Sequence, residues 1–261
     1  MRGKQLITTC ISLLLALACF CACGRTADVY QSCSADIGEK SFSICCRVGD
    51  PLMDILIAAL QVCKADGTTQ RLSESWFGRD LTELKGELQA LSGLKTEPGR
   101  VLLLGYDESA FPFAGTDETG KPRGFELELA ESVCELLGWE LRALPIDPKQ
   151  IRIELASGEV DVVWGGVSQE ADKNVRTLQY MKAEYVILSR TEAAVKNARS
   201  LQGKRLSYPP FVQNAAESAG ISDRAEMAVK LADTEACITA MNAGRCDAVL
   251  TDAVSAAYFM R

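Results

Sequence analysis

An alternation of apolar runs and amphipathic segments between Val101 and Gly166 constrains the fold of this chain more than any other feature. Helix patterns within it end at Gly138 and at Gly158, since glycine commonly follows the last helical residue. The apolar runs predict buried strands at Val101–Gly105, Trp139–Leu144 and Val160–Trp164. The resulting order, strand–helix–strand–helix–strand, predicts a parallel sheet with crossover helices.

A second αβ series follows this first one. Its expected strands are Tyr185–Ser189, Arg205–Tyr208, Ala228–Leu231 and Asp247–Thr251, with helices at Gln213–Ala219, after Thr234 and at Asp252–Met260. Two segments echo each other, LASGEVDVVWGG (Leu155–Gly166) and MNAGRCDAVLTD (Met241–Asp252). The echo favours two related lobes, although two independent and common αβ units remain open. Ligands of open parallel sheets lie beyond the carboxyl ends of the strands, so Gly165–Ser168 and Asp252 are expected to face one cleft.

The segment before these two series also reads as αβ structure. Strands are expected at Asp28–Cys33 and Phe42–Arg47, with a polar turn over Ser34–Lys40 between them. Asp50 and an apolar stripe predict a long helix, and a shorter one ends at Trp76-Phe77-Gly78. Leu81, Leu84, Leu88 and Leu91 then predict a helix over Asp80–Leu94, which Gly86 weakens.

Composition excludes several function classes. The 261 residues carry a net charge of −7 and no histidine. The acidic balance argues against nucleic-acid partners. Without histidine there is no Ser-His-Asp or Cys-His catalysis and no histidine-ligated metal, and we expect neither a metal nor a cofactor.

The first 23 residues have the pattern of a lipoprotein signal peptide. Arg2 and Lys4 precede an apolar core, Leu6–Ala18, that is short for a bilayer span. Cys19 and Cys23 both lie in lipobox-like contexts, and we favour Cys23 as the lipidated residue. An ordinary signal peptide or an uncleaved anchor remains open. The seven later cysteines lie mostly in apolar runs, which predicts small core residues rather than a disulfide framework.

Several motifs together resemble the bacterial extracellular solute-binding proteins of family 3, the amino-acid type. RVGD (Arg47–Asp50), KADG (Lys64–Gly67) and WFG (Trp76–Gly78) resemble the closing segment of that family, although here they come first. Five later segments resemble the opening and middle of the family: GYDESAFPF, GKPRGFELELAESVCELLG, SGEVDVVWGG, the L-x-G-K of Leu201–Lys204 and GRCDAVLTD. The resemblance implies an α/β, two-lobed, periplasmic-binding-protein-like (type II) fold with a hinge and an inter-lobe cleft, circularly permuted.

The permutation sets the expected lobes. Lobe 1 is residues 44–188, with a tie at 81–100 that joins the family's usual ends, and lobe 2 is residues 28–43 plus 189–261. We expect Phe42–Arg47 to cross between the lobes beside Tyr185–Ser189. We also expect Val29–Cys33 to join the sheet of Asp247–Thr251.

The resemblance also implies site residues. Asp252 would hold a ligand ammonium, which a carboxylate suits, although a helix cap is its alternative role. The other implied ligand-binding residues are Asp107, Phe111, Trp164, Gly166, Ser168, Lys173 and Arg176. Two departures affect carboxylate recognition. Lys173 stands where the family has an arginine, and Pro209–Asn214 replaces a helix start that offers N–H groups.

The implied function is an extracytoplasmic, lipid-anchored monomer that captures a small polar, amino-acid-like solute by lobe closure for the membrane subunits of an ABC importer. One alternative is a sensor or degenerate binding-fold protein without transport. Another is an enzyme resembling cyclohexadienyl dehydratases, for which Glu170, Asp172 and Lys173 are acid–base candidates. Exchange of the early segment between neighbouring molecules is a further alternative.

Overall fold

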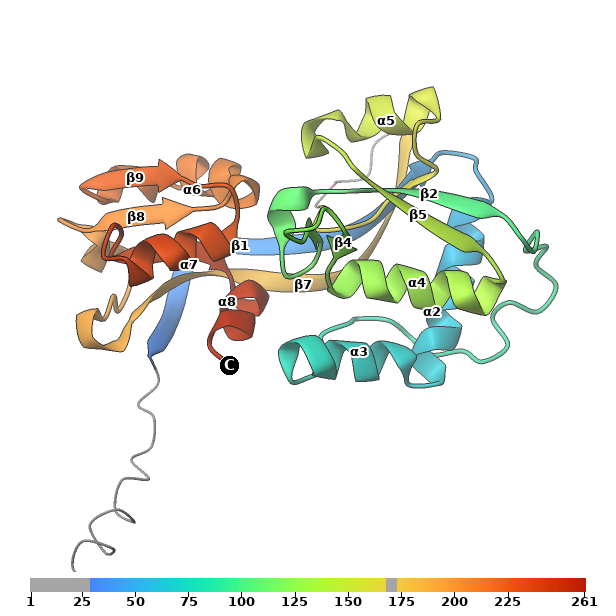
Figure 1. Cartoon of the computed structure of the whole chain (residues 1–261), viewed down its shortest axis with the longest axis horizontal. Coiled ribbons are helices and arrows are strands. Elements are labelled where there is room, and N and C mark those ends of the chain that lie inside the picture. The colour runs from blue at the N-terminus through green and yellow to red at the C-terminus, as the bar shows by residue number, and fades with distance from the viewer. Residues whose placement is uncertain (1–28, 168–172) are drawn as a thin grey trace, which may run out of the picture.

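In the computed structural model, which describes residues 29–167 and 173–261, one eight-stranded sheet runs through two αβ lobes (Figure 1). The strand order is β5-β2-β6-β1-β7-β10-β8-β9. The strands are β1 (Tyr30–Arg47), β2 (Val101–Tyr106), β5 (Glu140–Pro145), β6 (Val162–Val163), β7 (Val175–Arg190), β8 (Arg205–Tyr208), β9 (Met227–Lys230) and β10 (Ala248–Asp252), and a small hairpin pairs β3 (Gly115–Thr116) with β4 (Pro122–Arg123). The helices are α2 (Leu52–Ala65), α3 (Thr68–Phe77), α4 (Phe125–Leu137), α5 (Ile151–Ser157), α6 (Gln213–Ser218), α7 (Thr234–Asn242) and α8 (Ala253–Phe259).

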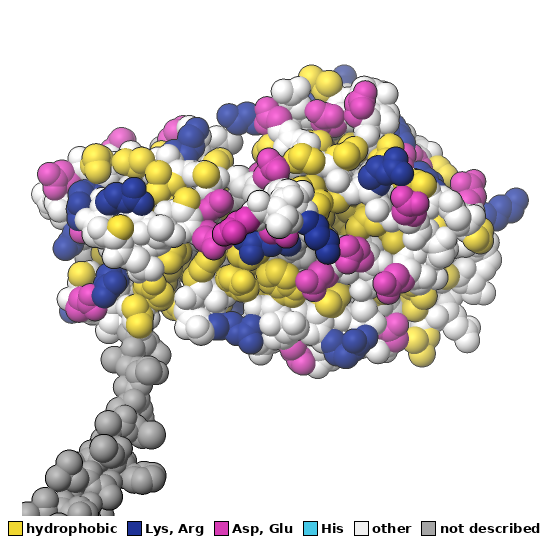
Figure 2. All heavy atoms as spheres, viewed as in Figure 1, with side chains coloured by type: hydrophobic (Ala, Val, Ile, Leu, Met, Phe, Trp, Pro, Cys, Tyr) yellow, Lys and Arg dark blue, Asp and Glu magenta, His cyan; other side chains and the backbone are white. Residues whose placement is uncertain are grey.

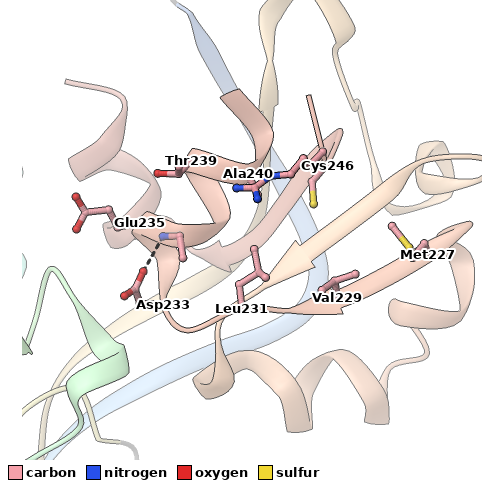
Figure 3. A pocket seen from close by; sticks show the side chains of 10 residues that line it. Met227, Val229, Leu231, Asp233, Glu235, Thr239, Ala240 and Cys246 are labelled. Atoms are coloured by element: carbon pink, nitrogen blue, oxygen red, sulfur yellow. Dashed lines mark hydrogen bonds between the residues drawn. The ribbon is translucent and has the colours of Figure 1, made fainter. Parts of the chain in front are cut away.

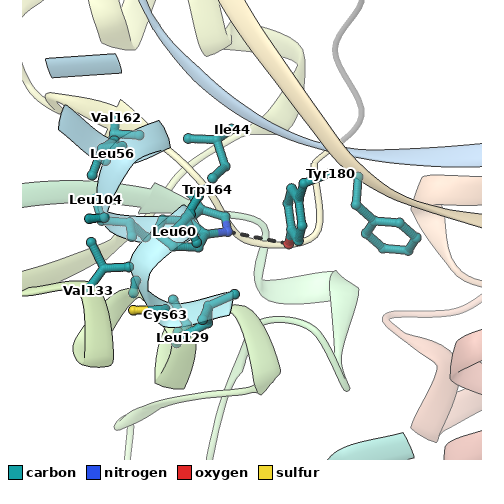
Figure 4. Packing of buried hydrophobic residues seen from close by; sticks show 14 of the residues in the cluster. Ile44, Leu56, Leu60, Cys63, Leu104, Leu129, Val133, Val162, Trp164 and Tyr180 are labelled. Carbon is teal, nitrogen blue, oxygen red and sulfur yellow. Dashed lines mark hydrogen bonds between the residues drawn. The ribbon is translucent and has the colours of Figure 1, made fainter. Parts of the chain in front are cut away.

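Lobe 1 contains the predicted parallel strands. β2 pairs in parallel with β5 and β6, as the sequence pattern predicts. Successive residues of a strand face opposite sides, so Val162 packs with α2 and α4 while Val163 packs with α5. Figure 4 shows the larger of these two cores, where Leu60 of α2 lies near Leu129 and Val133 of α4.

Lobe 2 repeats this layering on a smaller scale. β8 pairs in parallel with β9 and β10. Leu250 packs on the side of α6, while Val249 packs on the side of α7 and α8. The helix expected after Thr234 begins at Thr234 itself, because Asp233 caps α7 and its carboxylate accepts a hydrogen bond from the Ala236 N–H at 2.7 Å.

Two long antiparallel strands, β1 and β7, run through both lobes (Figure 1). The turn predicted over Ser34–Lys40 is wrong. β1 continues through it, with a bulge between Ser34 and Glu39 where Asp36 and Gly38 adopt positive φ angles of 56° and 96°.

The bulge explains why the pairing differs from the one we expected. Because the strand does not turn, Phe42–Arg47 pairs with Val175–Met181 rather than with Tyr185–Ser189. The start of β1 lies in the same sheet as β10, as expected, with β7 between them. β1 therefore does cross from one lobe to the other.

The helix predicted over Asp80–Leu94 is also wrong. This segment runs along α2 without helical structure, and the Glu87 N–H donates to the Gln61 carbonyl at 3.0 Å. Lys64 anchors its start through Asp80 at 2.5 Å. A Cβ on Gly86 would lie 2.9 Å from the Ala65 Cα, so the segment follows α2 closely only because residue 86 is glycine. This tie joins α3 to β2.

The surface carries mixed charges, and the cysteines of the described residues lie mostly in the interior. Acidic and basic side chains are interspersed over the face drawn in Figure 2. All seven cysteines of the described residues are free, and all except Cys33 are buried. Burial raises the pKa of Cys45, Cys46, Cys134 and Cys237 to about 12, so these thiols stay protonated at neutral pH. Within residues 29–167 and 173–261, no helix has the length and apolar character that a bilayer crossing needs.

Candidate functional site

A cavity of about 200 Å³ lies between the two lobes. Its walls follow the carboxyl ends of the strands, where a parallel sheet presents loops from several strands together. Lobe 1 contributes Asp107, Pro148, Lys149, Gly166 and Val167, lobe 2 contributes Pro210, Phe211, Gln213, Asn214 and Lys230, and Lys40 comes from β1. We call this cavity the inter-lobe cleft.

Two of the predicted ligand residues, Asp107 and Gly166, line this cleft. Asp107 directly follows β2, and its carboxylate accepts hydrogen bonds from the N–H and hydroxyl of Ser109 at 2.9 and 2.7 Å. Gly166 follows β6 with a φ of +72°, and an added Cβ would lie 1.9 Å from the Ala110 Cβ. Glycine is therefore required there, so that the chain can turn against the loop after β2.

A buried carboxyl group fixes the Gly166 turn from behind. Glu126, in the first turn of α4, accepts hydrogen bonds from the Gly166 N–H and from the Tyr180 hydroxyl. It is fully buried, and this burial raises its pKa to about 7. Glu126 is thus a positioning residue for the cleft wall, and it titrates near neutral pH.

Lys40 is the most unusual residue of the cleft. Its side chain is 2% exposed, and its Nζ has no hydrogen-bond partner among the described residues. Instead, Nζ lies over the rings of Phe211 at 3.9 Å, Phe42 at 4.6 Å and Phe113 at 5.6 Å. Burial lowers its pKa, while the negative charges of Asp252, Asp107 and Glu126 act in the opposite direction.

Asp252 ends β10 and caps α8. It is fully buried, and one carboxylate oxygen accepts hydrogen bonds from the N–H groups of Val254 and Ser255 at 3.0 and 2.8 Å. The other oxygen accepts from the Ser255 hydroxyl at 2.7 Å. The capping role that we held as the alternative is thus present, and Asp252 also acts electrostatically on Lys40. A contact between Asp252 and a ligand remains a prediction.

Asp252 does not line the cleft, and neither do three further predicted residues. Phe111 is buried, with its ring 4.0 Å from the Arg123 guanidinium and 5.3 Å from the Tyr258 ring. Trp164 is fully buried in the lobe 1 core, where its indole N–H points to the Tyr180 hydroxyl at 3.4 Å (Figure 4). Arg176 pairs with Asp54 at the start of α2, at 2.6 Å.

The remaining predicted residues are placed as follows. Lys173 is exposed, two residues before β7, and it is absent from the cleft lining. Ser168, the acid–base candidates Glu170 and Asp172, and the proposed lipidation site Cys23 lie outside the described residues. Their roles stay predictions.

Sequence reasoning missed Lys40 because it placed this residue in a turn. A usable signal was present, since Lys40, Phe42 and Ile44 alternate with Ser41 and Ser43 and therefore share one face of a strand. The other missed cleft residues are Phe211, Gln213 and Asn214. They lie in the Pro209–Asn214 segment, which we had interpreted only as a departure from the family pattern.

A larger cavity of about 580 Å³ lies at the outer edge of lobe 2 (Figure 3). It is bounded by β9 and α7, and its lining includes Met227, Val229, Leu231, Asp233 and Cys246. We place the candidate site in the smaller cleft, because that cleft is shared by both lobes and contains the buried charged groups. Among the residues that the structure describes, no group of histidine, cysteine or acidic side chains is arranged to hold a metal ion.

Comparisons with known proteins place the chain among bacterial solute-binding proteins by similarity. Residues 102–204 match the model of the bacterial extracellular solute-binding proteins, family 3. The L-cystine-binding protein TcyJ of Escherichia coli (strain K12) is 23% identical over 175 residues, which is 62% of this chain and 62% of that protein. The chain therefore matches less than two thirds of the length of this relative.

A solved structure matches the fold. The crystal structure of the ancestral amino acid-binding protein AncCDT-1, a precursor of cyclohexadienyl dehydratase, aligns with a TM-score of 0.50 at 24% identity. The alignment covers 61% of this chain and 73% of that one. At this identity the likeness supports the two-lobed binding-protein fold alone.

Proposed function

Since this chain is a relative of the bacterial extracellular solute-binding proteins of family 3, we propose that it captures a small, amino-acid-like solute in the inter-lobe cleft and delivers it to an ABC importer. The observation that carries the proposal is the cleft itself, in which Asp107 and Gly166 of lobe 1 face Phe211 and Asn214 of lobe 2. A solute bound there touches both lobes. It would therefore favour the closed arrangement over an open one.

The hinge of this proposed closure is the β1–β7 pair. These two strands carry the chain between the lobes, and their pairing is irregular between Ser34 and Glu39. A bulge is a place where a strand pair bends without losing its other hydrogen bonds. Lobe closure about this point would move Phe211 relative to Lys40.

The proposed location is the outer face of the cell membrane. We propose that Cys23 carries a lipid, with Cys19 as the alternative site, and that the mature protein works as a monomer beside the importer's membrane subunits. Lipid labelling of the Cys23→Ala variant in cells tests the anchor. Loss of label supports Cys23, whereas retained label that Cys19→Ala removes would move the anchor to Cys19.

Binding itself is tested by thermal unfolding of the mature protein with a panel of solutes. The panel contains amino acids, L-cystine, N-acylated amino acids and 2-oxo acids. A ligand at 100 times its Kd stabilises a protein by about 2.7 kcal/mol, which is readily seen as a higher melting temperature. A panel without a single stabilising solute, together with no co-purified small molecule by mass spectrometry, would contradict the proposal.

The same panel separates binding from catalysis. We propose that the chain is a binding protein and not an enzyme. Incubation with a cyclohexadienyl acid should leave that acid unchanged, and measured turnover would instead support the dehydratase-like alternative. A solute that binds in the absence of neighbouring importer genes would favour the sensor alternative.

A further inference from the structure

We propose that the ammonium group of Lys40 is a built-in cation that fills the cation-binding position of the inter-lobe cleft, so that this cleft takes a small carboxylate solute without a free ammonium group. The inference rests on the proposed function for its solute. Its structural part, that Lys40 occupies a preformed cation site, stands on the contacts of Lys40 alone.

The walls around the Lys40 Nζ suit a cation. Three phenyl rings surround it, with centroids 3.9, 4.6 and 5.6 Å away. The face of an aromatic ring is negative, and a cation within about 6 Å of the ring centre is attracted to it. Phe42 and Phe113 pack in the core around β2 and α4, whereas Phe211 follows β8 on the other side of the cleft, so Lys40 contacts both sides.

The nearby charges suit a cation as well. The carboxyl groups of Asp252, Asp107 and Glu126 are buried, and each acts electrostatically on Lys40. A solute carboxylate beside Nζ would bring a further negative charge into this buried group of acids, where repulsion is poorly screened. Rings and distributed negative charge therefore surround an Nζ that has no hydrogen-bond partner in the described part of the chain, and a further anion there would be repelled.

A free ammonium group of a solute would meet the opposite problem. It would place two cations in one buried position, unless Lys40 moved away or lost its proton. The outer part of the cleft contains two further cations, Lys149 and Lys230, and Lys230 donates to the Gln213 amide oxygen at 3.0 Å. A carboxylate at these lysines is charge-compatible. The solute class is therefore a small carboxylate whose nitrogen is absent or acylated.

Chemical rescue tests the occupied cation site. Lys40→Ala removes three methylenes and the ammonium, which together correspond to the propylammonium ion. We expect propylammonium to raise the melting temperature of K40A by at least about 2 °C, and 1-propanol, which is similar in size but neutral, to leave it unchanged. The wild type should respond to neither compound.

The matched control is Lys182→Ala, since Lys182 is an exposed lysine on β7, the strand that pairs with β1. K182A should not respond to propylammonium. If K40A fails to fold alone, the same comparison is made on its refolding yield. Equal effects of propylammonium and 1-propanol, or no effect of either, would overturn the occupied cation site.

Matched solutes test the specificity. Each α-amino acid of the thermal panel is compared with its N-acetyl and 2-oxo derivatives on the wild type. We expect the derivatives to stabilise and the parent amino acids to have at least tenfold weaker binding. Parents that bind as tightly as their derivatives would overturn this inference while leaving the proposed function intact. Successful rescue of K40A without any stabilising solute would instead count against the proposed function.

Discussion

Gly166 illustrates how one residue sets the shape of the cleft wall. Its φ of +72° and its approach to Ala110 exclude a Cβ, and its N–H is held by Glu126. Gly203 has the same φ of +72°, with open space around it. Substitution of Gly203 therefore introduces backbone strain alone, whereas substitution of Gly166 introduces the same strain and a steric conflict.

We expect Gly166→Ala to destabilise the protein by about 2 kcal/mol more than Gly203→Ala. The control carries only the cost of a positive φ, about 1 kcal/mol, whereas the Gly166 variant adds overpacking against Ala110. Urea unfolding midpoints measure the difference. Equal losses for the two variants would mean that the loop after β2 moves away freely, and that the turn at Gly166 is not packed as described.

The buried carboxyl group of Glu126 should make the stability of the protein depend on pH. Its pKa is raised from 4.5 to about 7 by burial, so between these pH values the folded protein keeps a proton that the unfolded chain has released. The contribution of this protonated carboxyl group to the free energy of unfolding is fully present below about pH 4.5. It is lost as the pH rises through 7. We expect the stability of the wild type relative to Glu126→Gln to fall by on the order of 2 kcal/mol from about pH 5 to about pH 8.

Thermal or urea unfolding at a series of pH values measures this difference. The control is Glu131→Gln, which changes an exposed carboxylate on the same helix. Its difference from the wild type should stay nearly constant with pH. A flat profile for E126Q as well would show that Glu126 is ionised throughout.

At the scale of elements, the tie between α3 and β2 is the clearest case in which a helical pattern did not give a helix. Leucines at helical spacing are also consistent with an extended segment that lies on a neighbouring helix. Here Leu81, Leu84 and Leu91 pack against the lobe 1 core, while Leu88 is 65% exposed. The segment obtains its contacts from Lys64, Gln61 and Tyr180, all distant in sequence, which no local pattern reveals.

This difference between the leucines is testable. Leu84→Ala should cost about 1 kcal/mol of unfolding free energy, because a half-buried side chain loses its packing, and Leu88→Ala should cost nearly nothing. Chemical unfolding of both variants gives the comparison. Similar losses for both would support the helical arrangement, in which the two leucines share one face.

The elements of lobe 1 were predictable where the pattern was long and periodic. β2, α4 and β5 follow from apolar runs and from glycines at helix ends, and these signals are local. The continuity of β1 was not predictable in the same way. Asp36 and Gly38 carry turn chemistry, but the partner β7 extends past them, so the same residues form a bulge. Lys40 was missed as a direct consequence.

For the candidate site, the positions of the strand ends could be predicted from the sequence better than the surroundings of the side chains. The echo of the two αβ units located Gly166 and the end of β10, because sheet topology fixes where strands end. The surroundings of Phe111, Trp164 and Arg176 depend on α2, α3 and α8. These helices come from distant parts of the chain, and the sequence gives no local signal of their packing.

At the scale of the whole molecule, a rotated order of parts relative to the family stays a prediction, and only one of its two expected contacts is present. The start of β1 shares a sheet with β10, whereas Phe42–Arg47 does not lie beside Tyr185–Ser189. In space, β1 lies between β6 and β7, in the middle of the sheet, although it comes first in the chain. The tie connects α3 to β2 around the edge of lobe 1 (Figure 1). At the far end of the chain, the Arg261 guanidinium donates to the carbonyls of Ser75 and Trp76 in α3, at 2.9 and 2.8 Å.

A rotated chain tests this prediction and the intramolecular completion of the fold together. The variant starts at Arg100, runs to Arg261, continues through a Gly/Ser linker of about 10 residues to Val29, and ends at Leu94. We expect a monomer whose melting temperature and solute response are close to those of the original order, because every strand keeps its neighbours. The control, residues 100–261 alone, should not fold, since it lacks β1. A rotated chain that forms only dimers by light scattering would favour exchange of the early segment between molecules, and one that cannot fold would contradict the rotated order.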